Sequence, residues 1–232
     1  MLSNINKVME ITGIIIFALG VLFSFYFIIK EIGERSFLKK ILYNIIGKEK
    51  IKSVEDLIAI KNYLQKNISY NTELKANKRP LLRHTASHIL KSKYGFCGEN
   101  ARVAIKLLML GGIKARRIYL FREVWEHVLI EHKMNNSWYM FDGHYDPSTL
   151  LKDHDVVSIY SEDIEKYPDD YPNNPYLDFC RIKLFYIIPP LKFLSKKKLP
   201  GFLSYIFESP YLIKFILGIL IIITGIIIFY LS

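Results

Sequence analysis

Two long apolar segments lie near the two ends of the chain. Residues 11–29 read ITGIIIFALGVLFSFYFII and residues 215–231 read FILGILIIITGIIIFYL, and neither segment contains a charged residue. Each is close to the roughly 20 residues that a helix needs to cross the hydrocarbon core of a bilayer. Buried core helices are the alternative, but a core helix of this length usually has a polar face. The pattern therefore predicts transmembrane helices over residues 11–29 and 212–231.

The first apolar segment could instead be a cleaved signal peptide. Only Lys7 precedes it as a basic residue, and no small-residue cleavage site follows Ile29. The apolar run is also long for a signal peptide, and it ends at the charged pair Lys30-Glu31. We interpret it as a retained anchor.

Between the two segments, the first half of the chain has helical periodicity. Apolar residues recur every three or four positions around a break at Gly47, and an apolar stripe follows Cys97. Ser53 and Asp56 resemble a capping pattern that would begin the second of these helices. The helical regions are expected over residues 31–66, 85–93 and 97–110.

After Gly111-Gly112 the pattern changes to that of short β-strands. Asn135-Asn136 is a plausible hairpin turn between the last two runs. The extended segments are expected over residues 68–71, 115–122, 126–133 and 138–143. Helices followed by antiparallel strands predict an α+β domain. Residues 152–178 are acidic and rich in proline, which predicts a loop.

Basic residues are concentrated beside the two apolar segments. The formal net charge is +10, and many of the basic residues follow the first segment or precede the second. They include Lys30, Arg35, Lys39, Lys40, Lys192, Lys196, Lys197, Lys198 and Lys214. The positive-inside rule then predicts that the central region faces the cytoplasm and that both termini lie outside. Anionic lipid headgroups would attract such residues. Because no nucleic-acid-binding motif accompanies them, we expect no nucleic-acid partner.

The chain has two cysteines, Cys97 and Cys180, which is too few for a disulfide framework. Cys97 lies in the stretch YGFCGEN and begins a predicted helix, where unpaired N–H groups favour a thiolate and can bind an oxyanion. The glycines at positions 95 and 98 would let a substrate backbone approach closely. An inert buried cysteine is an equally common outcome for this position. We expect Cys180 to have a packing role.

The predicted hairpin selects one histidine as a partner for this thiol. If Asn135 and Asn136 are the two turn residues, the register sets Leu129 opposite Asp142. Alternation along the strand then brings His127 and Asp142 to the same face as diagonal neighbours, and it puts His132 on the other face. A three-residue turn would reverse this parity. With the two-residue turn, Asp142 can orient the His127 ring towards the thiol.

The order of these motifs resembles the transglutaminase-like superfamily. That superfamily has a glycine shortly before a cysteine that begins an apolar helix, then a G-I-x-A-R turn, and then a histidine, a tryptophan and an aspartate. The matching positions are Asn67–Tyr70, Gly95, Cys97, Ala101–Leu110, Gly112–Arg116, His127-Val128, Trp138 and Asp142. Many members have a tryptophan beside the cysteine or the histidine, where this chain has Gly98 and Val128.

The resemblance implies a papain-like transglutaminase core and a Cys-His-Asp triad. Cys97 would be the nucleophile, His127 the general base and acid, and Asp142 the orienting residue. The activity would be that of a cysteine protease or amidase acting on a protein or peptide. We favour hydrolysis over transamidation because no calcium-site pattern or extra β-domain is present. A catalytically inactive peptide-binding or scaffold protein at the membrane is the alternative.

The predicted organisation has six parts. They are a tail (1–10), a transmembrane helix (11–29), a basic juxtamembrane helix (30–53), the transglutaminase-like domain (54–186), a basic connector (187–211) and a second transmembrane helix (212–231).

Other chemistry is less well supported by the sequence. A zinc site could combine Cys97 with histidines such as His84 and His88, but no second paired cysteine and no H-E-x-x-H motif is present, so no metal or cofactor is expected. We expect His84 and His88 to lie on a solvated helix face. Glu99 or Glu126 could act as a base, although a surface charge is the commoner role.

Overall fold

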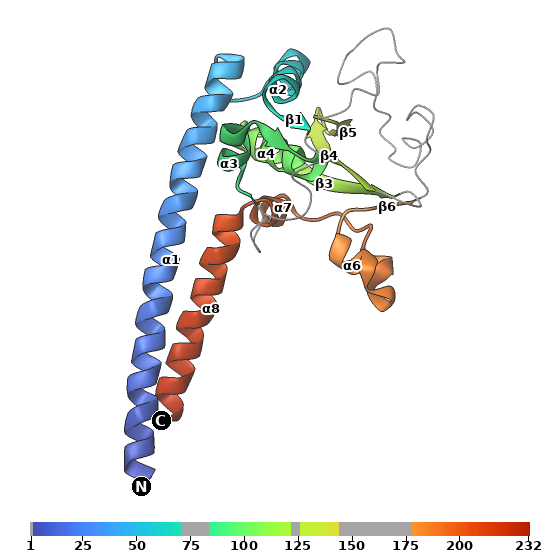
Figure 1. Ribbon diagram of the computed structural model, residues 1–232. Helices are drawn as coiled ribbons and strands as arrows, with labels where there is room; N and C mark the ends of the chain where they lie inside the picture. The colour runs from blue at the N-terminus through green and yellow to red at the C-terminus, as the bar shows by residue number, and fades with distance from the viewer. Residues whose placement is uncertain (1, 71–83, 122–125, 144–177) are drawn as a thin grey trace. The chain divides into compact units, whose positions relative to one another are not determined.

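The computed structural model describes residues 2–70, 84–121, 126–143 and 178–232 (Figure 1). The chain divides into two compact units. Residues 1–36 and 209–232 form the first unit, and residues 37–208 form the second. The expected loop over residues 152–177 lies outside the described residues.

The first unit is built from two apolar helices, the first part of α1 (Leu2–Ile46) and α8 (Pro210–Leu231). The stretches Asn6–Ile46 and Pro210–Leu231 are long and apolar enough to cross a membrane. The helix α1 continues beyond Lys30-Glu31 and ends at Gly47, whose φ of +68° lies in the left-handed region that favours glycine at a helix end.

Glycines allow the two apolar helices of the first unit to approach each other closely. A Cβ atom added at Gly13 would lie 2.8 Å from the backbone nitrogen of Phe229, and one added at Gly225 would lie 2.6 Å from that of Phe17. Both distances are too short for a real side chain. Small residues at such positions are typical of helix pairs that pack within a membrane, where close backbone contact replaces the hydrophobic effect.

The second unit begins with helices that the sequence predicted. They are α2 (Val54–Asn67), α3 (Ala86–Ser92) and α4 (Cys97–Leu110). The N-terminus of α2 is capped because Asp56 Oδ2 accepts from the backbone N–H of Ser53 at 3.1 Å. The side chain of Thr85 accepts from the N–H of His88 and caps α3. Gly111 and Gly112 end α4, and Gly112 has a φ of +88°.

A four-stranded antiparallel sheet follows, in the order β5-β4-β3-β6. Its strands are β3 (Lys114–Phe121), β4 (Glu126–Met134), β5 (Ser137–Phe141) and β6 (Asp178–Cys180). A separate parallel pair joins β1 (Ser69–Tyr70) to β2 (Tyr94–Gly95). The strands β2 and β6 were not predicted, because each is two or three residues long and exists only through its pairing with a distant segment.

The turn between β4 and β5 has the two-residue form on which the predicted register depends. Asn135 and Asn136 have φ values of +48° and +68°, and Met134 pairs with Ser137. Two consecutive left-handed residues produce a turn whose twist matches that of the strands. The register therefore continues to the pair Ile130–Phe141, as predicted.

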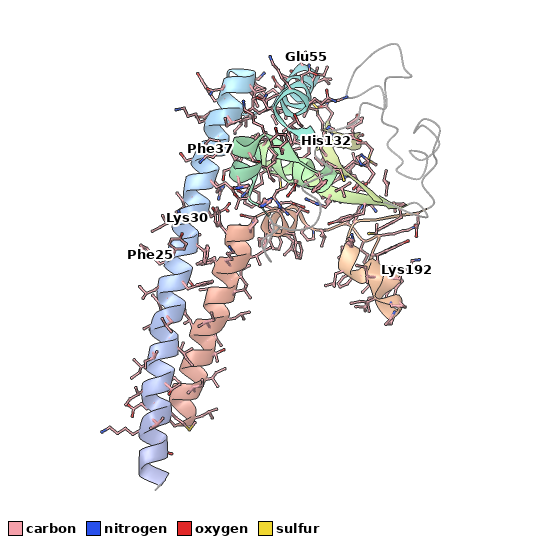
Figure 2. All side chains as sticks on the ribbon, viewed as in Figure 1. Phe25, Lys30, Phe37, Glu55, His132 and Lys192 are labelled. Atoms are coloured by element: carbon pink, nitrogen blue, oxygen red, sulfur yellow. The ribbon has the colours of Figure 1, made fainter. Side chains whose placement is uncertain are left out.

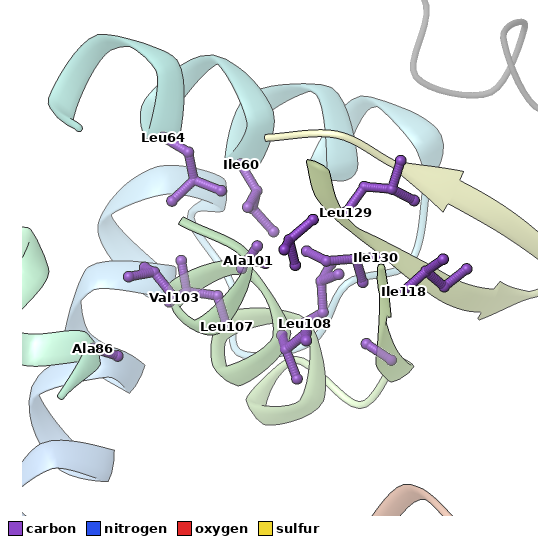
Figure 3. Packing of buried hydrophobic residues seen from close by; sticks show 14 of the residues in the cluster. Ile60, Leu64, Ala86, Ala101, Val103, Leu107, Leu108, Ile118, Leu129 and Ile130 are labelled. Carbon is purple, nitrogen blue, oxygen red and sulfur yellow. The ribbon is translucent and has the colours of Figure 1, made fainter. Parts of the chain in front are cut away.

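The core of the second unit lies between α2, α4 and the sheet (Figure 3). Leu64 from α2, Leu108 from α4 and Leu129 from β4 are almost fully buried there. Two buried residues of α1, Leu38 and Leu42, also belong to this cluster. The observed architecture is the predicted α+β arrangement.

The stretch predicted as a connector contains regular structure. It holds part of α6 (Lys183–Ile187), the 3-10 helix η3 (Pro189–Leu194) and α7 (Gly201–Phe207). Pro189 and Pro190 are at the N-terminus of η3, where proline is well tolerated because its missing N–H needs no partner.

Candidate active site

Cys97 is the first residue of α4 and is half-buried. The turn that holds it is capped, since the backbone N–H of Phe96 donates to Glu99 Oε2 at 3.0 Å. The first N–H groups of any helix have no acceptor within the helix, so they carry partial positive charge near this thiol. The predicted position of the cysteine at a helix N-terminus is confirmed.

His127 and Asp142 form a buried pair. His127 Nε2 lies 2.6 Å from Asp142 Oδ2, and both side chains are 1% exposed. His127 is on β4, and Asp142 directly follows the last residue of β5. The register of these two strands makes His127 and Asp142 diagonal neighbours. His132 lies on the other face of β4, as the alternation predicted.

The first turn of α4 is tied to the end of β5. Asn100 is buried and its Nδ2 donates to the backbone carbonyl of Gly143 at 3.1 Å. A Cβ atom added at Gly143 would lie 2.3 Å from Asn100 Oδ1, so a larger residue there would require the Asn100 side chain to move. Asn100 belongs to the same turn as Cys97, and Gly143 directly follows Asp142. This bond therefore holds the cysteine helix against the aspartate.

The surroundings of His127 favour its protonated form. Burial lowers the pKa of the ring, but the negative charge of Asp142 and the hydrogen bond to it raise the pKa, as do a hydrogen bond and a charge interaction with Cys97. The net effect raises the pKa of His127 to about 10. In contrast, burial alone lowers the pKa of His132, on the same strand, to about 4. The difference arises from the partners and not from the depth of burial, because both rings are buried.

A buried arginine supports the turn that carries Cys97. Arg117 Nη2 donates to the backbone carbonyl of Gly98 at 2.6 Å. The same guanidinium forms two bonds of 2.6 Å to the carboxylate of Glu208, and the three residues are held together below the first turn of α4. The charge of Glu208 raises the pKa of Arg117 further above its ordinary value, against the effect of burial.

The two glycines beside Cys97 have a packing role that differs from the expectation. A Cβ atom added at Gly98 would lie 3.0 Å from the guanidinium of Arg117. One added at Gly95 would lie 3.2 Å from Ile68 and 3.3 Å from Glu99. Both glycines are therefore explained by their neighbours within the domain, without a substrate.

Glu99 is a structural residue and not a surface charge. In addition to the N–H of Phe96, it contacts His84, whose Nδ1 lies 2.9 Å from Glu99 Oε1. The rings of His84 and His88 are stacked with their centroids 4.6 Å apart. His88 is exposed, but His84 is partly buried, so the expectation of a solvated face holds only for His88. The side chain of Glu126 lies outside the described residues.

A second buried ion cluster lies on the sheet. Glu131 binds both Arg116 and Arg181, and Arg181 Nη2 lies 2.6 Å from Glu131 Oε1. The guanidinium of Arg116 also stacks on Trp138, 3.7 Å from the ring centroid. This arrangement agrees with a structural role for the arginine of the G-I-x-A-R turn. Cys180, which was expected to have a packing role, is fully buried.

The zinc alternative receives no support from these side chains. Within the described ranges, no group of three or more histidine, cysteine, aspartate or glutamate residues is placed to hold a metal ion.

The residues brought together are thus a half-buried thiol at a helix N-terminus and a buried histidine–aspartate pair that interacts with it. These residues lie in the α+β domain described above. Residues 39–143 match the family model of the transglutaminase-like superfamily. The matched residues include Cys97, His127 and Asp142, so the likeness to this superfamily extends over the whole candidate site.

One solved structure that is similar to this chain is described as a "putative cysteine protease" from Cytophaga hutchinsonii. The sequence identity is 23% and the TM-score is 0.39. The match covers 47% of this chain, and this chain covers 37% of that protein. No curated protein matches the chain.

The support of Cys97 through Arg117 and Glu208 was not predicted. Arg117 follows the motif arginine Arg116 directly, and nothing in the local pattern separates their roles. Glu208 is 91 residues further along the chain from Arg117, so no local pattern could have paired them. Two adjacent basic residues at the start of a strand are the one available signal, because alternation must send them to opposite faces of the sheet.

Proposed function

We propose that this protein is a membrane-anchored cysteine protease or amidase that acts on a protein or peptide through Cys97, His127 and Asp142. The observation that carries the proposal is the geometry of the buried His127, whose Nε2 lies 2.6 Å from Asp142 Oδ2 and which also interacts with Cys97 at the N-terminus of α4.

The roles of the two ring nitrogens follow from the hydrogen bond. Since Nε2–H donates to Asp142, Nδ1 is the nitrogen that can exchange a proton with the Cys97 thiol. Transfer of the thiol proton to Nδ1 gives a thiolate–imidazolium pair, which Asp142 stabilises through its charge. Asp142 also fixes the ring orientation, and the Asn100–Gly143 bond fixes the distance between the aspartate and α4.

The reaction would proceed in two steps. In the first step, Cys97 Sγ attacks the substrate carbonyl carbon, an S–C bond forms and the C–N bond breaks. The Nδ1 proton of His127 passes to the leaving nitrogen, which departs as an amine and leaves a thioester. In the second step, water attacks the thioester carbonyl and gives its proton to Nδ1. The C–S bond breaks, the acyl group leaves as a carboxylic acid, and the thiolate–imidazolium pair is restored.

The N-terminus of α4 would stabilise the oxyanion formed in each step. The backbone N–H of Cys97 is the expected donor, and its position depends on the first turn of the helix. That turn is held by the Glu99 cap and by the bond from Arg117 to Gly98. Both contacts therefore support the proposed chemistry without touching the substrate.

Membrane anchoring by α1 and α8 is the second part of the proposal. Many large apolar side chains of these helices are exposed, such as Leu22 at 66% and Phe25 at 64%. Exposure of these apolar side chains to water is unfavourable, and contact with lipid tails would remove that cost. The basic residues beside the two helices favour an orientation with the domain in the cytoplasm and both termini outside.

The thiol chemistry is tested by labelling the purified full chain with an iodoacetamide probe from about pH 5 to about pH 9. We expect selective labelling of Cys97 near neutral pH, slower labelling in His127→Ala, and no change in Cys180→Ala. Cys180 is the matched control because it is the second thiol of the chain and is fully buried. Labelling of Cys180 alone, or of neither cysteine before denaturation, would contradict the proposal.

Two further measurements separate the remaining possibilities. Incubation with a peptide library and an added amine, followed by mass spectrometry, distinguishes a carboxylic acid product from an amide product. An inactive binding domain would give neither product, although Cys97→Ala would still bind the peptide. For the orientation, a fusion reporter at Ser232 should report the outside, and a cytoplasmic signal would overturn the argument from charge.

A further inference from the structure

The segment between β6 and α8 carries an unusual set of exposed apolar side chains. Five of them lie on α6, η3 and α7, and each is more than half exposed. They are Leu184 (64%), Ile187 (63%), Phe193 (74%), Phe202 (66%) and Phe207 (52%). Isolated exposed apolar residues are common in soluble proteins, but a concentration of large ones marks a contact surface.

The first part of this segment, residues 183–194, is a fixed protrusion. Its two ends are joined, since the backbone N–H groups of Arg181 and Ile182 both donate to the carbonyl of Ser195, at 2.9 and 3.0 Å. The side chain of Arg181 donates to the carbonyl of Lys196 at 2.7 Å and also binds Glu131 of β4. The base of the protrusion is thus attached to the sheet, from which it projects beside β6 (Figure 1).

The inner side of the protrusion is also held in place. Tyr186 stacks on Phe121 of β3 with the ring centroids 4.2 Å apart and the rings nearly parallel. The Nζ atom of Lys192 also lies over the Tyr186 ring, 4.7 Å from its centroid. Leu184, Ile187 and Phe193 of the same protrusion are exposed. The exposure is therefore a property of a stable element.

The chemistry of the surroundings identifies the partner. Exposed lysines accompany the apolar side chains on the same segment, at positions 192, 196, 197 and 198, and Figure 2 shows Lys192 on the protrusion. Lysine is depleted in the centre of protein–protein interfaces. In contrast, lysines next to phenylalanine and leucine are typical of elements that lie in the headgroup region of an anionic bilayer.

The position of the segment in the chain agrees with the same partner. The helix α7 ends at Phe207, and α8, the second proposed membrane span, begins at Pro210. A side chain at Phe207 or Phe202 is therefore within a few residues of the point where the chain would enter the bilayer. We propose that residues 183–207 form a peripheral membrane surface, whose apolar side chains insert between anionic lipid headgroups and hold the domain against the bilayer.

This inference depends on the proposed membrane spans and is independent of the thiol chemistry. It goes beyond anchoring, because it assigns a lipid contact to a surface of the domain itself. If the domain is held there, its substrate is a protein or peptide that can reach the membrane surface.

The test uses the full chain with Cys97→Ala and Cys180→Ala, so that one new cysteine can carry an environment-sensitive fluorophore. The label is placed by Phe193→Cys, and the protein is reconstituted into vesicles of phosphatidylcholine with or without phosphatidylglycerol. Lipids with a shallow spin label should quench the fluorophore at position 193, and more strongly when phosphatidylglycerol is present. Circular dichroism of each variant confirms that it is folded.

Two matched positions serve as controls. Tyr94→Cys places the label at another exposed aromatic position of the domain, 48% exposed, where no quenching is expected. Leu220→Cys places it in α8, where quenching by deeply labelled lipids is expected. Replacing Lys197 and Lys198 with glutamine should lower the ratio of inserted to free protrusion about 25-fold on the anionic vesicles, at about fivefold for each lysine.

Four other results are possible, and each would refute part of this inference. Quenching at position 220 without quenching at position 193 refutes the membrane surface and leaves the spans intact. Absence of quenching at position 220 refutes the spans, and the inference with them. Equal quenching at positions 94 and 193 shows that the segment has no special role. Protection at position 193 that depends on the protein-to-lipid ratio identifies a second copy of the chain as the partner, which also refutes the inference.

Discussion

Replacing Asp142 with asparagine removes one negative charge from a buried pair and leaves the shape of the side chain almost unchanged. Asparagine Oδ1 can still accept the Nε2–H of His127, so the ring should keep its orientation. What is lost is the charge that favours the imidazolium. The protonation state of His127 should therefore change while the fold remains.

The magnitude follows from a comparison within one strand. His127 and His132 are both on β4 and both almost fully buried. The pKa of His132, where burial acts alone, is lowered to about 4, whereas the pKa of His127 is raised to about 10. Without the Asp142 charge, the pKa of His127 should fall to near its ordinary value of 6.5, because burial still lowers it while the interaction with Cys97 still raises it. One pH unit corresponds to about 1.4 kcal/mol, so the imidazolium should lose on the order of 5 kcal/mol of stabilisation.

The contribution of His127 to the pH dependence of stability should then largely disappear. In the wild type, the folded pKa of His127 lies above the unfolded value of 6.5, so its contribution is fully present below pH 6.5 and is lost as the pH rises towards 10. In Asp142→Asn the folded pKa should lie near the unfolded value, so this contribution is absent at every pH. The variant should therefore be least stable relative to the wild type below pH 6.5, and the two should converge at high pH.

Nuclear magnetic resonance of the full chain with labelled histidine rings measures the change directly. The resonance of His127 is assigned by its loss in His127→Ala, and the His132 resonance is the internal control, because its pKa should not move. At pH 7 the variant should also label more slowly at Cys97, and hydrolysis should fall by about 10²–10⁴-fold. A His127 ring that still titrates near pH 10 in Asp142→Asn would refute the role given to the carboxylate.

Two other perturbations have matched controls within the chain. Glu208→Gln and Glu131→Gln each leave buried arginine side chains without their counter-charge and should cost about 3 kcal/mol of stability. Only Glu208→Gln should slow the alkylation of Cys97, because its partner Arg117 binds the turn beside the thiol. Equal alkylation rates in the two variants would argue against that support. Gly13→Leu should lower the thermal stability of the reconstituted protein by separating α1 from α8, whereas Gly33→Leu should not, since nothing lies within 4 Å of a Cβ atom there. Equal melting temperatures would mean that the two helices do not pack through this face.

Local pattern was sufficient for most of the fold because the elements are amphipathic and clearly bounded. The bounds of α4 were predicted to the residue, since an apolar stripe begins after Cys97 and two glycines follow it. The pairing of His127 with Asp142 was predicted because a two-residue turn fixes the register of the whole hairpin. The strand β6 was not predicted, because its three residues pair with β3 across a long stretch of chain.

The same distinction explains which parts of the candidate site were missed. Cys97, His127 and Asp142 have local signals, namely a helix start, an alternation and a turn. The residues that hold them in place do not. Asn100 reads as an ordinary helix residue, yet it bridges α4 to Gly143, and Gly95 and Gly98 suggested open space, yet they are packed. Such contacts join segments that are distant in sequence, so they become visible only when the fold brings them together.

Glu208 lies in the sequence at the junction between the domain and the second apolar helix. Glu208 is the last residue of the second unit, and α8 begins two residues later at Pro210. Its carboxylate is buried against Arg117, which in turn binds the carbonyl next to Cys97. A fragment that ends at residue 186 therefore lacks the counter-charge of a buried arginine, and the loss of one partner from such a pair costs about 3–5 kcal/mol. Because that arginine supports the turn of the proposed nucleophile, the folded domain has to extend to the residue that directly precedes Ser209, at the beginning of the proposed anchor.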